Sequence, residues 1–214
     1  MLLWILGIAA LVISRLWLIP VYYGQGSRVQ KLAAKGAPTA MAALFGLAAC
    51  LQNGDRYALL IFLGLSVCVA ADIMLDVKFL AGGVLFLMGH IFYMTALGGY
   101  HAPGWAFVPV FVTGTAVLWL FCRRYLHLFP NRLLFAGVLV YCMALAAVLG
   151  FSLPLPFAAP SQRTVLAALG AAMFVVSDMT TCHCVLAKPG LRFEYNSLTI
   201  YYAAQFLLGM SAFA

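Results

Sequence analysis

Long apolar stretches, separated by short polar or Pro/Gly-containing segments, follow one another along the whole chain. A hydrocarbon core about 30 Å thick is crossed by a helix of about 20 apolar residues, so each stretch predicts a membrane-spanning helix. The breaks place about eight such helices, at 1–20, 33–51, 58–77, 79–98, 105–123, 132–152, 163–187 and 196–213. We therefore predict an all-α, polytopic membrane protein whose residues 1–214 form a single helical bundle.

Composition supports this interpretation and narrows the class of protein. Hydrophobic residues make up 66% of the chain and charged residues 8%, and the mean hydropathy is +1.07. The net charge of +7 is then better explained by membrane topology and anionic lipids than by nucleic acid. The first stretch, MLLWILGIAALVISRLWLIP, has no basic start and no small-residue cleavage site, so we expect a retained helix. The six cysteines lie mostly in apolar spans, and a disulfide framework is not expected.

Basic residues are distributed unevenly between the two sets of loops. Eight crossings put both termini on one side, and the loops on that side carry only Arg56 and Arg163. The loops and helix ends on the other side carry Arg28, Lys31, Lys35, Lys78, Arg123, Arg124, Arg132, Lys188 and Arg192. By the positive-inside rule the basic side faces the cytoplasm, and both termini face away from it.

Two segments share a glycine followed eight positions later by an aspartate. GLSVCVAADIML runs from Gly64 to beyond Asp72, and GAAMFVVSDMTT runs from Gly170 to beyond Asp178. The two segments lie in predicted helices that cross the membrane in the same direction, four spans apart. The shared spacing therefore indicates a parallel four-plus-four repeat.

Asp72 and Asp178 are the two acidic residues that lie clearly within predicted spans. An aspartate near the centre of a membrane helix costs about 2.5 to 3.5 kcal/mol, and this cost is usually met by facing the bundle interior or a wet cavity. Both lie in the cytoplasmic half of the membrane, where Lys35, His90, Tyr93, Tyr201, Tyr202 and Gln205 can also contribute polar groups. We expect a polar pocket that opens to the cytoplasm, with apolar walls suited to a lipid-like ligand.

Structural alternatives remain for each of these residues. A buried aspartate can pair with Lys35 and lock the bundle, and His90 can serve as an interhelical hydrogen-bonding residue. The adjacent Cys182, His183 and Cys184 suggest a metal site, but successive helical residues point about 100° apart and cannot converge on one ion. We therefore expect no metal, and no phosphate-loop, dinucleotide or serine-nucleophile motif is present.

The order of four motifs resembles the YhhN-type lysoplasmalogenase family, which includes the animal transmembrane lysoplasmalogenases. The motifs are GLSVCVAADIML, FLAGGVLFLMGHIFYMTAL, LGAAMFVVSD and YYAAQFLLG, within a region from about Lys35 to Gly209. The functional positions of the family fall on Asp72, His90, Tyr93, Asp178, Tyr202 and Gln205. Ala71 replaces the family's usual glycine before the first aspartate, and Pro38 alters the Lys-Pro spacing after Lys35.

The resemblance implies hydrolysis of the vinyl ether bond of lysoplasmalogens to a fatty aldehyde and glycerophosphoethanolamine or glycerophosphocholine. Vinyl ether hydrolysis needs a general acid, an anion beside the oxocarbenium ion, and a water molecule. Asp72 and Asp178 form the predicted catalytic pair, as in the carboxylate pairs of glycosidases. His90, Tyr93, Tyr202 and Gln205 would orient water or substrate, and Lys35 would meet the phosphate.

The resemblance also implies an enzyme of the bacterial inner membrane that requires no cofactor, with membrane lipids as its surroundings and no nucleic-acid partner. Two other classes of function stay open from the residues alone. A parallel repeat with paired intramembrane aspartates also suits a proton-coupled transporter. The third class is a lipid-binding protein without turnover. The sequence leaves open which aspartate is the acid, which head group is preferred, and the oligomeric state.

Overall fold

The computed structural model describes residues 2–128 and 132–214, and residue 1 of the first predicted helix lies outside these ranges. The described residues are helical, with no strand among them. The first helix is continuous through α1 (Leu2–Ile13), a π-helical turn (Ser14–Leu18) and α2 (Ile19–Tyr23). The remaining long helices are α3 (Arg28–Asn53), α4 (Arg56–Val77), α5 (Phe79–Tyr100), α6 (Phe107–Arg123), α7 (Arg132–Ser152), α9 (Gln162–Ala187) and α10 (Leu191–Ser211). A short 3₁₀ turn (Leu126–Leu128) and α8 (Leu155–Ala158) lie in connections.

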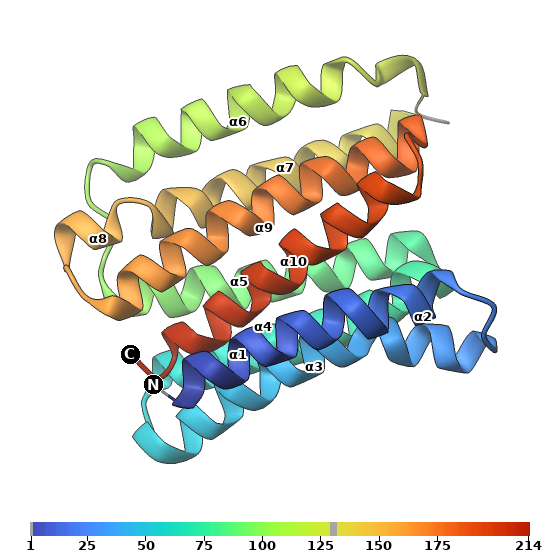
Figure 1. Ribbon diagram of the computed structural model, residues 1–214. Coiled ribbons are helices and arrows are strands. Elements are labelled where there is room, and N and C mark those ends of the chain that lie inside the picture. The colour runs from blue at the N-terminus through green and yellow to red at the C-terminus, as the bar shows by residue number, and fades with distance from the viewer. Residues whose placement is uncertain (1, 129–131) are drawn as a thin grey trace.

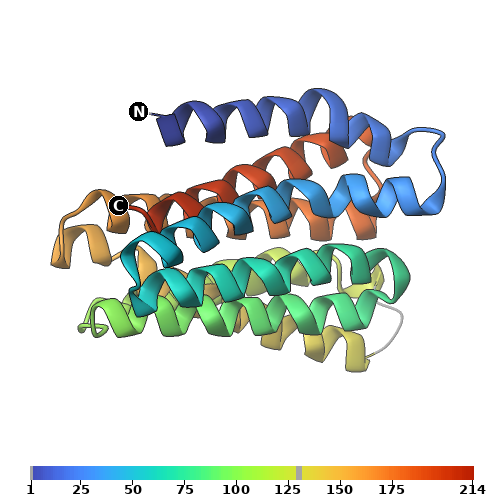
Figure 2. The same cartoon turned by 90° about the horizontal axis from the view of Figure 1, so that it is seen from below.

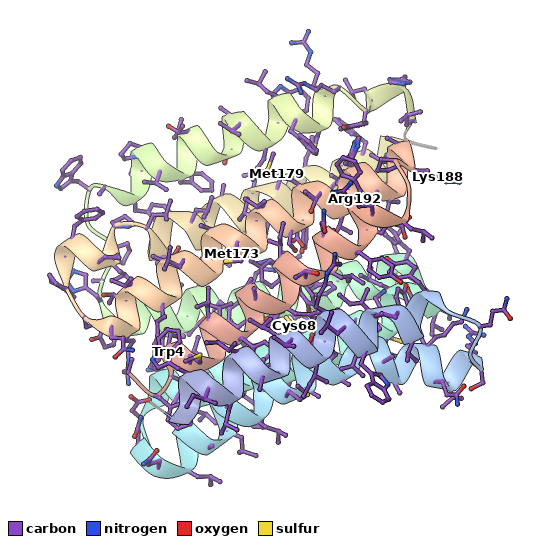
Figure 3. The ribbon with its side chains drawn as sticks, in the orientation of Figure 1. Trp4, Cys68, Met173, Met179, Lys188 and Arg192 are labelled. Carbon is purple, nitrogen blue, oxygen red and sulfur yellow. The ribbon has the colours of Figure 1, made fainter. Side chains whose placement is uncertain are left out.

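The long helices run up and down beside one another and form one bundle (Figure 1). Helix α6 lies at the outside of the bundle and packs against α7, and α1 lies on the other side against α3 and α10. The two termini lie at the same end of the bundle (Figures 1 and 2). We call the opposite end the basic end, because it carries Lys188 and Arg192 (Figure 3) and the connecting residues 24–27, 78 and 124–128.

Six helical segments of the described chain are long and apolar enough to cross a membrane. They are Trp4–Tyr23, Arg28–Asn53, Arg56–Val77, Phe79–Tyr100, Leu134–Ala158 and Gln162–Ala187. Helix α6 is apolar but has only 17 residues, and α10 carries charged and hydroxyl side chains in its first half. The predicted helices are therefore present, whereas a count of eight membrane crossings is not confirmed.

Two helices begin earlier than the apolar pattern predicted. Helix α3 begins at Arg28, not at residue 33, because Ser27 caps it and exchanges capping-box hydrogen bonds with Gln30. Helix α10 begins at Leu191, not at residue 196, directly after Gly190, whose φ of 114° ends the preceding connection. Each additional turn contains two charged residues, which lower its hydropathy, so the apolar pattern alone assigns it to a loop.

The two glycine-aspartate segments lie on α4 and α9, which run in the same direction through the bundle (Figure 1). A Cβ atom on Gly64 would lie 2.5 Å from the ring of Tyr93, and one on Gly170 would lie 3.0 Å from the side chain of Leu208. Both glycines therefore allow a neighbouring helix to approach closely. The parallel four-plus-four repeat itself stays a prediction.

Candidate functional site

A cavity of about 240 Å³ lies toward the basic end of the bundle, and side chains from α2, α3, α4, α5, α9 and α10 line it. Four of the five acidic residues of the chain face it, namely Asp72, Asp76, Asp178 and Glu194. The expectation that the two segments bring Asp72 and Asp178 to one cavity is therefore confirmed. Their catalytic roles stay a prediction.

Asp72 forms part of the inner wall, and only 2% of its surface is exposed. Its Oδ2 atom accepts hydrogen bonds from the hydroxyl groups of Thr39 on α3, at 2.5 Å, and Tyr201 on α10, at 3.1 Å. Helices α3, α4 and α10 thus meet at one carboxylate. The contacts satisfy the polar group that would otherwise be costly at this depth.

Asp178 on α9 is more exposed to the cavity than Asp72. Its Oδ2 atom accepts one hydrogen bond, at 2.5 Å, from the hydroxyl of Tyr141 on α7. The ring of Tyr141 packs edge-on against the imidazole of His90, with centroids 5.3 Å apart. Each aspartate thus accepts hydrogen bonds from hydroxyl groups of neighbouring helices, and among residues 2–128 and 132–214 Asp178 has one such partner and Asp72 has two.

Near the mouth of the cavity, the ammonium group of Lys35 forms an ion pair with Asp76 at 2.6 Å. The hydroxyl of Tyr22 donates to the same Asp76 oxygen at 3.1 Å, and the Lys35 nitrogen lies 5.2 Å from the centre of the Tyr22 ring. Lys35 is 7% exposed. It lines the cavity as predicted, but its charge is already compensated by Asp76.

A second, outer cavity of about 320 Å³ adjoins the first. The two cavities share Tyr22, Tyr23 and Asp76 as lining residues. The outer cavity is otherwise lined by Arg28, Lys31 and Leu32 of the first turns of α3. The polar outer space thus continues into an inner space whose apolar lining comes from Leu75, Phe79, Phe86, Val185 and Leu198.

Three of the other predicted site residues form a closed layer behind the cavity, which we define as His90, Tyr93 and Gln205. None of the three lines either cavity, and each is at most 1% exposed. The His90 Nδ1 atom lies 2.6 Å from the carbonyl of Phe86, and the Tyr93 hydroxyl donates to Gln205 Oε1 at 3.0 Å. The expectation that these side chains orient water or substrate therefore stays a prediction, and none of them has a surface on either cavity.

Phe174 separates the closed layer from the cavity. Its ring packs edge-on against His90, at 4.8 Å between centroids, and against Tyr201 of the cavity wall, at 5.5 Å. On the closed side, His90 Nε2 and Gln205 Nε2 have no hydrogen-bond partner among the described residues. Because none of the three residues lines a cavity and Phe174 lies between them and the cavity wall, the closed layer does not face a ligand in the cavity.

Tyr202 also lies outside the cavity lining, because its ring points from α10 toward the backbone of α3. Its hydroxyl donates to the carbonyl oxygen of Lys35 at 2.9 Å. That carbonyl lies in the helical turn that precedes Pro38. Tyr202 thus connects α10 to the backbone of α3, and the neighbouring Tyr201 takes the position beside Asp72.

Sequence reasoning missed the contributions of Thr39, Tyr141 and Asp76 to this site. Thr39 had a signal, because it follows Lys35 by four residues and shares its helix face. Tyr141 also had one, as a hydroxyl-bearing side chain within an apolar helix. Asp76 follows Asp72 by four residues, so it lies one helical turn further along the same face of its helix. The partners of these residues depend on how the helices pack, which the pattern of one helix does not contain.

The described residues include no group of three or more His, Cys, Asp or Glu side chains that could hold a metal ion. His183 Nδ1 lies 2.7 Å from the hydroxyl of Tyr125, so this imidazole already has a protein partner. All six cysteines are free thiols, and Cys122 and Cys142 approach to 3.6 Å between sulfur atoms.

Comparison with protein families gives a match to the YhhN family over residues 30–212. The match covers most of the chain and includes α3 through α10, which contribute most of the cavity lining. The comparisons with curated proteins and with solved structures gave no match.

Proposed function

Because the chain belongs to the YhhN family, we propose that it is a lysoplasmalogenase, a membrane hydrolase that cleaves the vinyl ether bond of lysoplasmalogens. The observation that carries this proposal is the pair of aspartates from α4 and α9 on one cavity. The apolar lining of that cavity suits the hydrocarbon chain next to the vinyl ether. We place the basic end in the cytoplasm by the positive-inside rule.

The first chemical step is protonation of the alkene. A carboxylic acid gives its proton to the β-carbon of the vinyl ether, and the π electrons of the double bond form the new C–H bond. The product is an oxocarbenium ion shared between the α-carbon and the ether oxygen. A nearby carboxylate stabilises this cation by electrostatic attraction in a site shielded from bulk water.

Water then completes the reaction. Its oxygen bonds to the α-carbon and its proton returns to the carboxylate that gave the first one, so the acid is regenerated. The hemiacetal formed in this way collapses when the bond between the α-carbon and the glycerol oxygen breaks and the hydroxyl proton passes to that oxygen. The products are a fatty aldehyde and glycerophosphoethanolamine or glycerophosphocholine, and one water molecule is consumed.

We assign proton delivery to Asp178 and stabilisation of the cation to Asp72. Proton delivery to a carbon atom requires a carboxyl group that reaches the substrate, and Asp178 is the more exposed of the two. The hydroxyls of Thr39 and Tyr201 both donate to Asp72. Hydrogen bonds donated to a carboxylate suit a group that stays an anion through the reaction.

The test is aldehyde release by the purified protein in detergent. The wild-type protein should release aldehyde from lysoplasmenylethanolamine but not from the alkyl ether analogue, which lacks the double bond. The double variant D72N/D178N should release none while it elutes and unfolds like the wild type. Asp55→Asn is the matched control, since Asp55 pairs with Arg163 at the opposite end of the bundle.

Turnover by D72N/D178N at the wild-type rate would contradict the assignment of the aspartates. Binding of lysoplasmenylethanolamine by the wild type without aldehyde release would contradict the hydrolase and favour a lipid-binding protein. A proton-coupled transporter would instead move its solute in sealed vesicles with a proton gradient and show no aldehyde release in detergent.

A further inference from the structure

The outer cavity brings together two basic side chains beside the first cavity, which Asp72 and Asp178 line. Arg28 and Lys31 line it on one side, and the two tyrosines Tyr22 and Tyr23 line it on the other. The one acidic side chain in its lining is Asp76, whose carboxylate is already paired with Lys35. The outer cavity therefore has a net positive charge.

Neither Arg28 nor Lys31 forms an ion pair with the residues that the structure describes. Lys35 differs from both, because it is buried and its ammonium group contacts Asp76 at 2.6 Å. A ligand anion at Lys35 would have to displace that carboxylate, whereas an anion at Arg28 and Lys31 would displace only water. The positive charges that an anionic ligand can bind without displacing a carboxylate are therefore those of Arg28 and Lys31 in the outer cavity.

One face of α3 connects the outer cavity to the catalytic aspartate. Arg28, Lys31, Lys35 and Thr39 follow one another at spacings of three or four residues, so they lie along the same side of the helix. Thr39 donates to Asp72. Lys31 and Thr39 lie eight residues apart, about 12 Å along an α-helix, a span that a glycerophosphate backbone and a lysine side chain can bridge together.

We propose that Arg28 and Lys31 bind the phosphate group of the lysophospholipid substrate while its ether bond lies at Asp72 and Asp178. This inference rests on the proposed function and moves phosphate binding from Lys35 to the first two turns of α3. Arginine presents paired N–H donors that match phosphate oxygens, and lysine adds a second positive charge. Lys35, held by Asp76, then forms part of the wall between head group and ether bond.

The experiment compares two vinyl ethers that differ in the phosphate. The substrates are lysoplasmenylethanolamine and the 1-alkenylglycerol with the same chain, and the quantity measured is the ratio of their KM values. In R28Q/K31Q the KM for lysoplasmenylethanolamine should rise about tenfold toward that of the alkenylglycerol, which corresponds to about 1.4 kcal/mol. The KM should change more than kcat, because the interaction is made equally in ground state and transition state.

K78Q/R124Q is the matched control. It removes the same formal charge at the basic end, and neither residue lines either cavity. The control should keep the wild-type preference for the phosphate-bearing substrate. An unchanged KM ratio in R28Q/K31Q, or an equal loss of preference in K78Q/R124Q, would overturn the assignment of the phosphate to these two residues.

Two further measurements distinguish a failure of this inference from a failure of the proposed reaction, and a lipid phosphate from free inorganic phosphate as the ligand. If the wild type releases no aldehyde, the affinities for the alkyl ether lysophospholipid and for the alkylglycerol are compared instead. R28Q/K31Q should then lose the preference for the phosphate-bearing ligand and still bind the alkylglycerol as the wild type does. The last arm measures inorganic phosphate binding directly. Binding of inorganic phosphate that R28Q/K31Q loses while lysophospholipid binding stays unchanged would show a free-anion site and overturn the lipid assignment.

Discussion

Asp72 and Asp178 line the cavity. The closed layer of His90, Tyr93 and Gln205 is enclosed by protein on the other side of Phe174. Both sets are polar, and both come from segments that resemble one family's motifs. They differ in what they touch. The aspartates accept hydrogen bonds from hydroxyl groups and line a cavity with space for a ligand. In the closed layer, His90 contacts a carbonyl of its own helix, and Tyr93 and Gln205 bond to each other.

This difference shows that one motif can contain both residues that line a cavity and residues that pack between helices. The closed layer holds α4, α5 and α10 in register through the Tyr93 hydroxyl, which contacts both Cys68 Sγ, at 3.6 Å, and Gln205. Such contacts set the positions of the helices that carry Asp72 and Tyr201. Substitutions in the two layers should therefore affect different measurements, namely turnover for the cavity wall and stability for the closed layer.

The largest expected effect follows from replacing one of the two proposed catalytic aspartates alone. Asp178→Asn should lower kcat by about 10²- to 10⁴-fold, the usual contribution of a general acid, without lowering the unfolding temperature. Aldehyde release and thermal unfolding of the same preparation provide the two measurements. A Gln205→Leu variant that lost as much turnover as Asp178→Asn while remaining equally stable would remove the distinction between cavity wall and closed layer.

The next effect compares two tyrosines, one in each layer. Tyr141→Phe removes the hydroxyl that donates to Asp178 within the described part of the chain and should lower kcat about tenfold, because the carboxyl group of the proposed general acid loses the contact that holds it in position. Tyr93→Phe should instead destabilise the protein by about 1 kcal/mol, because it leaves Gln205 Oε1 without its donor. Steady-state kinetics and thermal unfolding of both variants provide the comparison. Equal losses of kcat in the two variants would contradict it.

The packing of the closed layer can be tested at Gly64. An alanine there places a methyl group 2.5 Å from the Tyr93 ring, and such overpacking typically costs about 1–3 kcal/mol. Gly83→Ala is the control, because a Cβ atom at that helical position has open space within 4 Å. The unfolding temperature should fall for Gly64→Ala alone. An equal decrease in both variants would mean that Tyr93 does not restrict this position.

Much of the fold could be predicted because membrane burial imposes a simple rule on sequence. A long apolar stretch predicts a membrane-spanning helix. The free-energy cost of a carboxylate within such a helix predicts that Asp72 and Asp178 face the bundle interior or a cavity. The early starts of α3 and α10 could not be read in this way, since caps and polar first turns look like loops on a hydropathy scale. Two partners of the aspartates were missed because Thr39 and Tyr141 reach them from other helices.

The adjacent tyrosines on α10 show this limit most clearly. The resemblance assigns a functional tyrosine to Tyr202, whereas Tyr201 contacts Asp72 and Tyr202 contacts the backbone of Lys35. Successive helical residues point about 100° apart, so only the rotation of α10 within the bundle determines which ring faces the cavity. Sequence spacing alone does not contain that rotation.

The smallest expected effect tests these two neighbours. Tyr201→Phe removes one of two donors to Asp72 while Thr39 remains, so kcat/KM should fall only about fivefold, equivalent to about 1 kcal/mol. Tyr202→Phe should keep kcat/KM and lower the free energy of unfolding by about 1 kcal/mol, because it removes the buried hydrogen bond from the Tyr202 hydroxyl to the Lys35 carbonyl. Measuring both quantities for both variants separates the two roles. The reverse pattern, with turnover lost in Tyr202→Phe and stability lost in Tyr201→Phe, would require α10 to be rotated by about one residue and would return the functional position to the one that the family motif indicates.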